Sequence, residues 1–270
     1  MADCWTRFLR LKLQIGGRGL LIGDVKEGKF PFLGSPISIP RSPICNINLK
    51  NLVQQSPTAM KITEIFFSIQ GESSHAGKPC VFVRLTGCSL RCVYCDTKYS
   101  YSGGTEMPLL DVIAAVKKHP AKLVEITGGE PLEQEEVYPL MERLLKDGYT
   151  VMLETGGHIA VDRVPSPVIK IIDIKCPASH EGHTVCWSNL DLAQPQDEFK
   201  FVISSRADYE WSRSVYRERL QSRPNTVLFS PSHDELPPGD LARWILEDGL
   251  PVRLQLQIHK YIWGANVRGV

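Results

Sequence analysis

Three cysteines lie within eight residues of one another, in the segment Gly87-Cys88-Ser89-Leu90-Arg91-Cys92-Val93-Tyr94-Cys95-Asp96. Cysteine thiolates hold iron–sulfur clusters, and they must converge from a short, adaptable loop. The C-x3-C-x2-C spacing of Cys88, Cys92 and Cys95 can place three sulfurs on three corners of one four-iron cluster. The fourth iron is then left without a protein ligand.

Zinc is the alternative metal for such a loop. A closed zinc site usually takes four protein ligands, and no C-x2-C or H-x3-H partner follows downstream. Cys80, Cys176 and Cys186 stand singly, and we expect them to pack in the protein interior rather than bind metal. The three clustered cysteines, with the aromatic Tyr94 before the last of them, therefore favour an iron–sulfur cluster.

A second pattern that can do chemistry is Ile126-Thr127-Gly128-Gly129-Glu130-Pro131, at the end of an expected strand. Glycine lets the backbone approach a ligand closely, and a carboxylate pairs with an ammonium group. Alone, the pattern is typical of a turn. Its place on a strand end, downstream of the cysteines, favours a binding role.

Arg84 is a charge in an otherwise apolar strand segment, four residues before Cys88. A buried guanidinium needs a partner. That partner is either an internal glutamate, such as Glu72 or Glu125, or an anion that arrives with a ligand. We predict the second.

The segments that must position these residues alternate between strand and helix patterns. Such alternation predicts an α/β fold with a parallel sheet, whose ligands bind at the carboxyl ends of the strands. Strands are expected at residues 61–67, 79–86, 123–127, 150–154, 169–174, 198–203, 226–230 and 252–257, and helices at 108–119, 134–146, 207–221 and 239–247.

Composition and charge restrict the function classes. The chain has 270 residues, 43% apolar and 23% charged, with a net charge of +1, so no overall field attracts nucleic acid or an anionic membrane. The longest apolar run is five residues, Val112 to Val116, against roughly 20 for a membrane helix. Charged residues also interrupt any signal-peptide core near the N-terminus. We expect a cytoplasmic protein that contacts neither membrane nor nucleic acid directly.

Residues 1–59 differ from the rest. They carry eight basic and three acidic groups, many glycines and prolines, and no sustained period, whereas residues 60–270 have a net charge of −4. We expect 1–59 to be a disordered extension or upstream sequence ahead of a natural start at Met60, and 60–270 to form one domain.

The two motifs resemble those of the radical S-adenosylmethionine superfamily, whose loop is C-x3-C-x-aromatic-C and which carries a Gly-Gly-Glu-Pro segment. The resemblance implies a partial (β/α) barrel, a 4Fe-4S cluster on Cys88, Cys92 and Cys95, and S-adenosylmethionine as cofactor. The implied cofactor contacts are Tyr94, Cys95, Asp96, Gly129, Glu130, Lys175 and Ser230.

Five separated blocks, all between Met60 and about Trp263, resemble the 7-carboxy-7-deazaguanine synthase family. They are residues 65–72 (IFFSIQGE), 82–88 (FVRLTGC), 95–97 (CDT), 173–177 (DIKCP) and 257–263 (QIHKYIW). Where that family often has glycine after Gln-Gly-Glu, this chain has Ser73. The resemblance implies a lyase that contracts 6-carboxy-5,6,7,8-tetrahydropterin to 7-carboxy-7-deazaguanine with loss of ammonia, for queuosine biosynthesis.

The same resemblance implies the remaining ligands and partners. Thr97 falls at the position expected to bind Mg2+, an ion that prefers oxygen ligands. A homodimer and an external electron donor such as flavodoxin are also implied. The implied contacts with the pterin are Ile69, Gln70, Gly71, Glu72, Arg84, Thr127 and His259.

Two other functions remain open on sequence alone. A glycyl-radical activase shares the cysteine loop but acts on a protein. A non-catalytic zinc module with a basic arm for RNA would use the same cysteines and residues 1–59. Gln70, Arg84 and Thr97 favour a pterin over a peptide.

Overall fold

The computed structural model describes residues 59–270, so the expected extension at 1–59 lies outside the described residues except for Ala59. The described chain forms one nine-stranded sheet in the order β3-β1-β2-β4-β5-β6-β7-β8-β9. The strands are β1 (Ala59–Ile69), β2 (Pro79–Leu85), β3 (Thr105–Pro108), β4 (Leu123–Gly128), β5 (Thr150–Thr155), β6 (Ile169–Asp173), β7 (Glu198–Ile203), β8 (Thr226–Pro231) and β9 (Arg253–Leu254).

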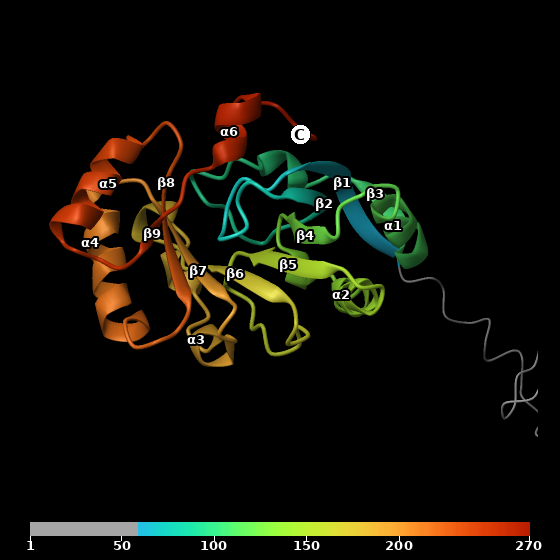
Figure 1. Ribbon diagram of the computed structural model, residues 1–270, viewed down its shortest axis with the longest axis horizontal. Coiled ribbons are helices and arrows are strands. Elements are labelled where there is room, and N and C mark those ends of the chain that lie inside the picture. The colour runs from blue at the N-terminus through green and yellow to red at the C-terminus, as the bar shows by residue number, and fades with distance from the viewer. Residues whose placement is uncertain (1–58) are drawn as a thin grey trace, which may run out of the picture. The chain divides into compact units, whose positions relative to one another are not determined.

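Helices follow most of the later strands. They are α1 (Leu109–Val116), α2 (Val137–Lys146), α3 (Asn189–Leu192), α4 (Arg206–Val215), α5 (Pro238–Glu247) and α6 (Ile258–Trp263). The strands curve into an open arc with α2 to α5 around its outside, while α6 lies near the C-terminus, apart from those helices (Figure 1). This arrangement confirms the expected α/β fold of the partial-barrel type.

The sheet is mixed, whereas we expected a parallel one. Strands β2 and β4 to β9 run parallel, but β1 pairs antiparallel with both β2 and β3. The connection from Ile69 to Pro79 is too short for the crossover of a dozen or more residues that parallel strands need, so the two strands form a hairpin instead.

The helices form where the sequence has a helical period. In α2 the buried residues Val137, Leu140, Met141 and Leu144 recur at helical spacing and face the sheet. Ser205 caps α4 by accepting a hydrogen bond from the backbone N–H of Asp208. The expected helix 207–221 changes at its end into a π-helical turn.

The pleat of the strands separates two kinds of surface. Val81 and Val83 of β2 belong to the large apolar core under the helices, whereas Cys80 and Phe82 belong to a smaller apolar cluster on the inner face. Successive strand residues point to opposite faces, so the next inner residue of β2 is Arg84. The inner face is therefore apolar near the start of the strands and polar at their carboxyl ends. Its apolar cluster consists of Cys80, Phe82, Leu123, Met152, Ile171 and Leu228.

Candidate functional site

A cavity of about 400 Å³ opens at the carboxyl ends of the parallel strands. This is the size and position of small-molecule sites in α/β folds. Every residue that the sequence predicted for the site borders it, except Glu130. The predicted residues on its wall are Ile69, Gln70, Gly71, Glu72, Arg84, Cys88, Cys92, Tyr94, Cys95, Asp96, Thr97, Thr127, Gly129, Lys175, Ser230 and His259.

The three cysteines lie on the loop that follows β2. Cys92 is buried, Cys88 and Cys95 are partly exposed, and all three are free thiols. Burial raises the pKa of the Cys88 thiol to about 11 and also raises that of Cys92. In residues 59–270 no group of three or more His, Cys, Asp or Glu side chains has a geometry that could hold a metal ion. The thiols would hold iron as thiolates, so binding would release their protons.

The donor set of this loop fits a cluster with three protein ligands. Cys80 and Cys176 are buried as expected, whereas Cys186 is partly exposed, so the expectation that it packs in the interior is wrong. None of the three borders the cavity. The hydroxyl of Tyr94 is buried on the same loop without a hydrogen-bond partner in the described chain, as expected of a group that awaits a ligand.

Gly129 brings the second motif against the cysteine loop. A Cβ atom at this position would lie 1.8 Å from the carbonyl oxygen of Gly87 and 2.9 Å from Cβ of Cys88. The backbone N–H of Glu130 donates to that same carbonyl oxygen over 2.7 Å. Only glycine permits this approach, so the two motifs form one wall of the cavity.

Glu130 lies behind that wall instead of bordering the cavity. Its carboxylate is fully buried and accepts hydrogen bonds from Thr155 Oγ1 and from the backbone N–H groups of Leu132 and Gly156. Burial raises the pKa of Glu130 to about 7, against these hydrogen bonds, which lower it. Its expected contact with the cofactor stays a prediction.

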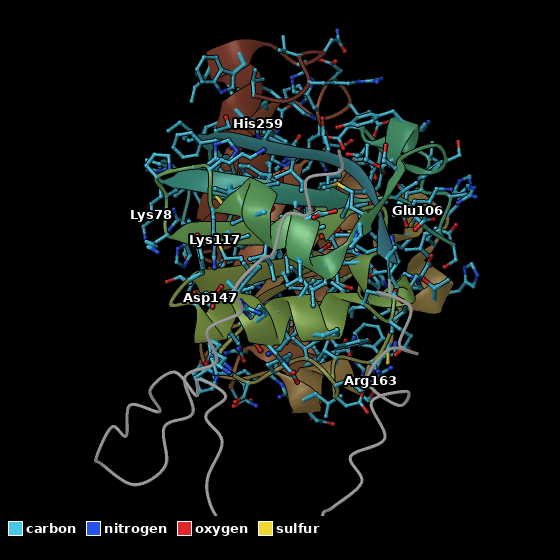
Figure 2. All side chains as sticks on the ribbon, turned by 90° about the vertical axis from the view of Figure 1, so that its right-hand side faces the viewer. Lys78, Glu106, Lys117, Asp147, Arg163 and His259 are labelled. Carbon is cyan, nitrogen blue, oxygen red and sulfur yellow. The ribbon has the colours of Figure 1, made fainter. Side chains whose placement is uncertain are left out.

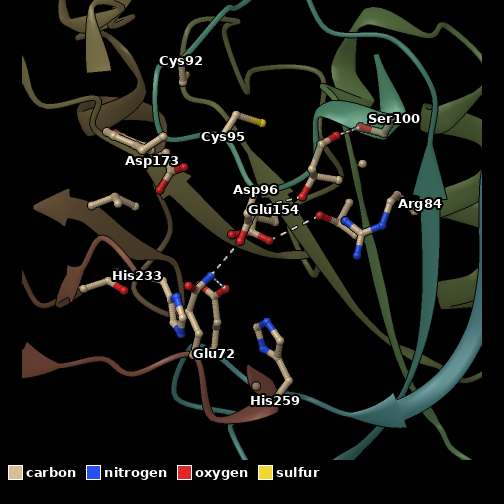
Figure 3. Close-up of a pocket in the computed structure, with 18 of the residues that line it drawn as sticks. Glu72, Arg84, Cys92, Cys95, Asp96, Ser100, Glu154, Asp173, His233 and His259 are labelled. Atoms are coloured by element: carbon tan, nitrogen blue, oxygen red, sulfur yellow. Dashed lines mark hydrogen bonds between the residues drawn. The ribbon is translucent and has the colours of Figure 1, made fainter. Parts of the chain in front are cut away.

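A buried ionic cluster forms the floor of the cavity. Lys200 on β7 contacts Glu154 at the end of β5, Glu72 over 3.0 Å and Asp173 over 3.7 Å. Lys175 donates to the other oxygen of Asp173 over 2.6 Å. Burial lowers the pKa of Lys200, but the carboxylates outweigh it and hold that pKa well above its ordinary value. Figure 3 shows Glu72, Glu154 and Asp173 gathered between the cysteines and His259.

Glu125 is a second carboxyl on the floor, hydrogen-bonded to the amide Nε2 of Gln70. Burial raises the pKa of Glu125 well above its ordinary value, and the negative charges of Glu154 and Glu72 raise it further. Thr127 Oγ1 donates to Glu154 over 3.3 Å. The floor thus offers both donors and acceptors to a flat heterocycle.

Arg84 has an internal glutamate partner, the alternative that we did not predict, and this partner is Glu64 instead of Glu72 or Glu125. Its Nε donates to Oε1 of Glu64 over 2.8 Å, and the two residues face each other across the antiparallel β1–β2 pair. Tyr99 donates to the same oxygen over 2.9 Å. Neither terminal nitrogen of Arg84 bonds to any residue in the described part of the chain. The guanidinium therefore still has donors for an anion.

The C-terminal segment borders the cavity from the other side. Lys260 of α6 donates to Asp96 Oδ2 over 2.7 Å, and Gln257 donates to Glu72 over 2.9 Å. Thr97 Oγ1 donates to the other oxygen of Asp96 over 2.9 Å. Partial desolvation raises the pKa of Asp96, but the Lys260 ammonium and the hydrogen bonds to its carboxylate outweigh this effect and hold the pKa well below its ordinary value. The cysteine loop and α6 are thereby tied together.

Ser73 takes the backbone conformation that the family's glycine would suit. Its φ of 63° lies in the left-handed region, and its hydroxyl accepts from the backbone N–H of His75 over 3.0 Å. The turn is thus retained with serine.

Several site residues were missed at the sequence level. What they share is a polar side chain in an otherwise apolar strand, at a position that the alternation of the strand places on the same inner face as Arg84 and Thr127. Glu125, Glu154 and Lys200 all satisfy it. The aromatic residues Phe66 and Phe82, whose rings stack 4.9 Å apart, also border the cavity.

Comparison with known proteins agrees with this site. The model of the radical SAM superfamily matches residues 82–219. Fold and cysteine loop together define a radical SAM protein.

Relatives within that superfamily are more specific. A 7-carboxy-7-deazaguanine synthase of Koribacter versatilis is 51% identical over 226 residues, covering 78% of this chain and all of the relative. One from Chlorobaculum tepidum is 47% identical, covering 78% of this chain and 97% of the relative. The crystal structure of QueE from Escherichia coli matches with a TM-score of 0.63 and 25% identity, covering 77% of this chain and 97% of that one. The chain belongs to the 7-carboxy-7-deazaguanine synthase family.

The sequence predicted no membrane helix, and the length and hydropathy of the described helices bear on this prediction. Among residues 59–270 none of the helices has the length and apolar character of a membrane span.

Proposed function

We propose that this protein is a radical SAM lyase that converts 6-carboxy-5,6,7,8-tetrahydropterin to 7-carboxy-7-deazaguanine with loss of ammonia. The observation that carries the proposal is that Cys88, Cys92 and Cys95, the Gly129 turn and a polar floor all border one cavity. The chain is 51% identical to a relative named 7-carboxy-7-deazaguanine synthase, and this identity supports the choice of reaction.

Cys88, Cys92 and Cys95 would hold a 4Fe-4S cluster. When bound together with S-adenosylmethionine, this cluster supplies a 5′-deoxyadenosyl radical that can abstract hydrogen from a substrate. Tyr94, Asp96, Gly129, Lys175 and Ser230 border the same cavity and are the proposed contacts of the cofactor.

The floor suits the two ends of a carboxypterin. Phe66 and Phe82 offer aromatic surface for the ring system, while Gln70 and Thr127 offer donors and acceptors to its polar edge. The terminal nitrogens of Arg84 would bind the carboxylate as a planar fork. Ile69, Gly71, Glu72 and His259 complete the proposed contacts.

Thr97 would contribute an oxygen ligand to Mg2+ beside the substrate. Its hydroxyl borders the cavity and in this structure donates to Asp96. Since Mg2+ keeps several waters and binds largely through its substrate, one protein oxygen is sufficient for such a site.

We also propose a homodimer, reduced by an external electron donor such as flavodoxin in the cytoplasm. Tyr261, Ile262 and Trp263 of α6 are 45% to 65% exposed, and exposed apolar groups that cluster in this way suit an interface.

Free thiols and a reducible cluster suit a reducing compartment, which supports the proposed location in the cytoplasm.

Residues 1–59 are proposed to be an extension that the reaction does not need. A whole relative aligns with 78% of this chain, which supports the proposal. A chain beginning at Met60 should keep the activity and the melting temperature, and a large loss of either would refute it.

Substrate choice is tested by incubating the reduced, cluster-loaded protein and S-adenosylmethionine with one of two substrates. One is the carboxypterin, and the other is a peptide with the glycine segment of a glycyl-radical enzyme. The proposal predicts that only the pterin is consumed. Consumption of the peptide alone would instead identify an activase.

A further inference from the structure

The turn that joins β1 to β2 crosses the inner side of the arc. Near its start, Gln70 Nε2 donates to the carboxylate of Glu125 on β4, whereas Glu72 pairs with Lys200 of β7 over 3.0 Å. Strands β5 and β6 lie between β4 and β7 in the sheet. This floor turn, residues 70–78, therefore spans the floor of the cavity and presents Gln70 and Glu72, two of the proposed contacts of the pterin, at its surface.

The floor turn lies at the far end of β1 and contains a strained residue. In Figure 2 Lys78, which ends the turn, lies at the left edge of the domain, and Glu106, which pairs with the start of β1, lies at the right. The backbone N–H of Gln70 donates to the Lys78 carbonyl oxygen over 2.8 Å and closes the turn. Within it, the left-handed conformation of Ser73 costs free energy because this residue has a side chain. Such a conformation persists where surrounding contacts hold it.

Glu198, at the start of β7, supplies such a contact. The backbone N–H of Ser74 is shared between both carboxylate oxygens of Glu198, each 3.1 Å away, and the Ser74 hydroxyl also donates to Oε1. Glu198 is only 2% exposed, and it lies on the same face of β7 as Lys200, two positions later. A buried carboxylate needs hydrogen-bond donors, and here the floor turn provides them. Neither Ser74 nor Glu198 borders the cavity, so their contact lies behind the floor.

We propose that Glu198 and Ser74 are positioning residues for the pterin, because their contact holds the floor turn in the conformation that presents Gln70 and Glu72. Hydrogen bonds to a carboxylate are stronger than those between neutral groups. When the contact is weakened, the turn leaves this conformation for part of the time, and the apparent dissociation constant rises as the competent fraction falls. The inference rests on the proposed function in taking the carboxypterin as the ligand of the cavity floor.

The variants separate the hydroxyl from the fold. Ser74→Ala removes the hydroxyl but keeps the backbone N–H, and it should fold because Ser74 is exposed. Ser74→Thr keeps both donors. The matched control is Ser214→Ala, since the Ser214 hydroxyl also donates to a carboxylate, that of Glu218, over 3.2 Å. That pair lies within α4 and the π-helical turn after it, and neither residue borders the cavity.

The experiment is an anaerobic equilibrium titration of the cluster-loaded protein without reductant, so that no turnover occurs. One titration adds S-adenosylmethionine alone, and the other adds the carboxypterin in the presence of Mg2+ and saturating S-adenosylmethionine. In Ser74→Ala the dissociation constant of the carboxypterin should rise about tenfold, the effect of losing one charge-assisted hydrogen bond, while that of S-adenosylmethionine should not change. Ser74→Thr and Ser214→Ala should match the parent for both ligands. Glu198→Gln should also weaken pterin binding, because a neutral amide is a weaker acceptor.

The outcomes are distinguishable. An unaltered dissociation constant for the carboxypterin in Ser74→Ala would overturn the inference and leave the proposed function intact. Equal weakening of both ligands in this variant would also overturn it, since that is the result of a structural role alone. Should Glu198→Gln fail to fold, the Ser74→Ala titrations decide. A parent protein that binds no carboxypterin would refute the proposed function, and this inference with it.

Discussion

Gly71 leaves the space that the imidazole of His259 occupies. A methyl carbon at Gly71 would lie 2.0 Å from Nδ1 of His259, and the Gly71 carbonyl oxygen accepts a hydrogen bond from the backbone N–H of Ile258 over 3.0 Å. The backbone of Gly71, which follows β1, thus packs against the side chain of His259 near the start of α6. The position of His259 at the cavity depends on this missing side chain.

Gly71→Ala should displace His259 and weaken carboxypterin turnover about tenfold or more, while the cluster and the melting temperature change little. Comparing Gly71→Ala, His259→Ala and the double variant gives the test. Because Gly71→Ala acts by moving His259, the double variant should be no worse than His259→Ala, whereas independent, additive losses would contradict the account.

Arg84→Lys should keep the fold, the cluster and uncoupled cleavage of S-adenosylmethionine, but weaken carboxypterin turnover by roughly 1.5 to 3 kcal/mol if one charge-assisted hydrogen bond is lost. A lysine can still pair with Glu64, but it lacks the planar fork. Steady-state kinetics with the pterin measure the effect. Kinetics equal to those of the parent, or loss of the fold before substrate is added, would rule out carboxylate binding by Arg84.

Lys200→Met should destabilise the domain by about 3 to 5 kcal/mol, because Glu72, Glu154 and Asp173 lose their shared cation in a buried site. Lys170→Met is the matched control. Lys170 is 2% exposed and paired with Asp197 over 2.8 Å, and neither residue borders the cavity.

Both variants should have lower free energies of unfolding in denaturant titrations. Under conditions where both are folded, only Lys200→Met should also impair binding of the pterin. Normal binding by Lys200→Met would show that the ionic floor has a structural role alone.

Glu130 should make stability depend on pH. Its pKa is raised from 4.5 to about 7 in the folded protein, so folding favours the protonated acid. The resulting stabilisation is full below pH 4.5 and is lost as the pH rises through about 7, a change of about 3 kcal/mol.

Glu130→Gln removes that contribution to the stability. The other buried acids are present in both the parent and the variant, so their effects on stability cancel in the comparison. The difference in unfolding free energy between parent and variant should therefore change between pH 5 and pH 8 in iron-free protein. A difference that stays constant over this range would contradict the raised pKa.

Much of the fold could be predicted because strand and helix periods are local. The seven strands from β1 to β8, leaving out β3, were located from their apolar runs. Strand β3 and helices α3 and α6 were missed because each has only four to six residues, too few to show a period. The antiparallel direction of β1 was missed because alternation alone indicated βα units.

The site was predictable where residues follow one another in a motif, as in the cysteine loop. Pairings between distant residues were not. Arg84 meets Glu64 only through the register of the β1–β2 hairpin, and Lys200 meets Glu72 across 128 positions of the chain. Glu125, Glu154 and Lys200 can be found from the alternation of each strand, because this alternation assigns every polar strand residue to the inner or the outer face of the sheet.

The most direct measurement is mass analysis of an anaerobic incubation of the cluster-loaded protein with S-adenosylmethionine, dithionite, Mg2+ and 6-carboxy-5,6,7,8-tetrahydropterin. The account predicts 7-carboxy-7-deazaguanine and ammonia from the parent and from Cys186→Ala, and neither product from Cys88→Ala, Cys92→Ala or Cys95→Ala. Recovery of intact pterin from a parent that contains a reducible 4Fe-4S cluster, or a parent that holds zinc and no labile sulfide, would contradict it.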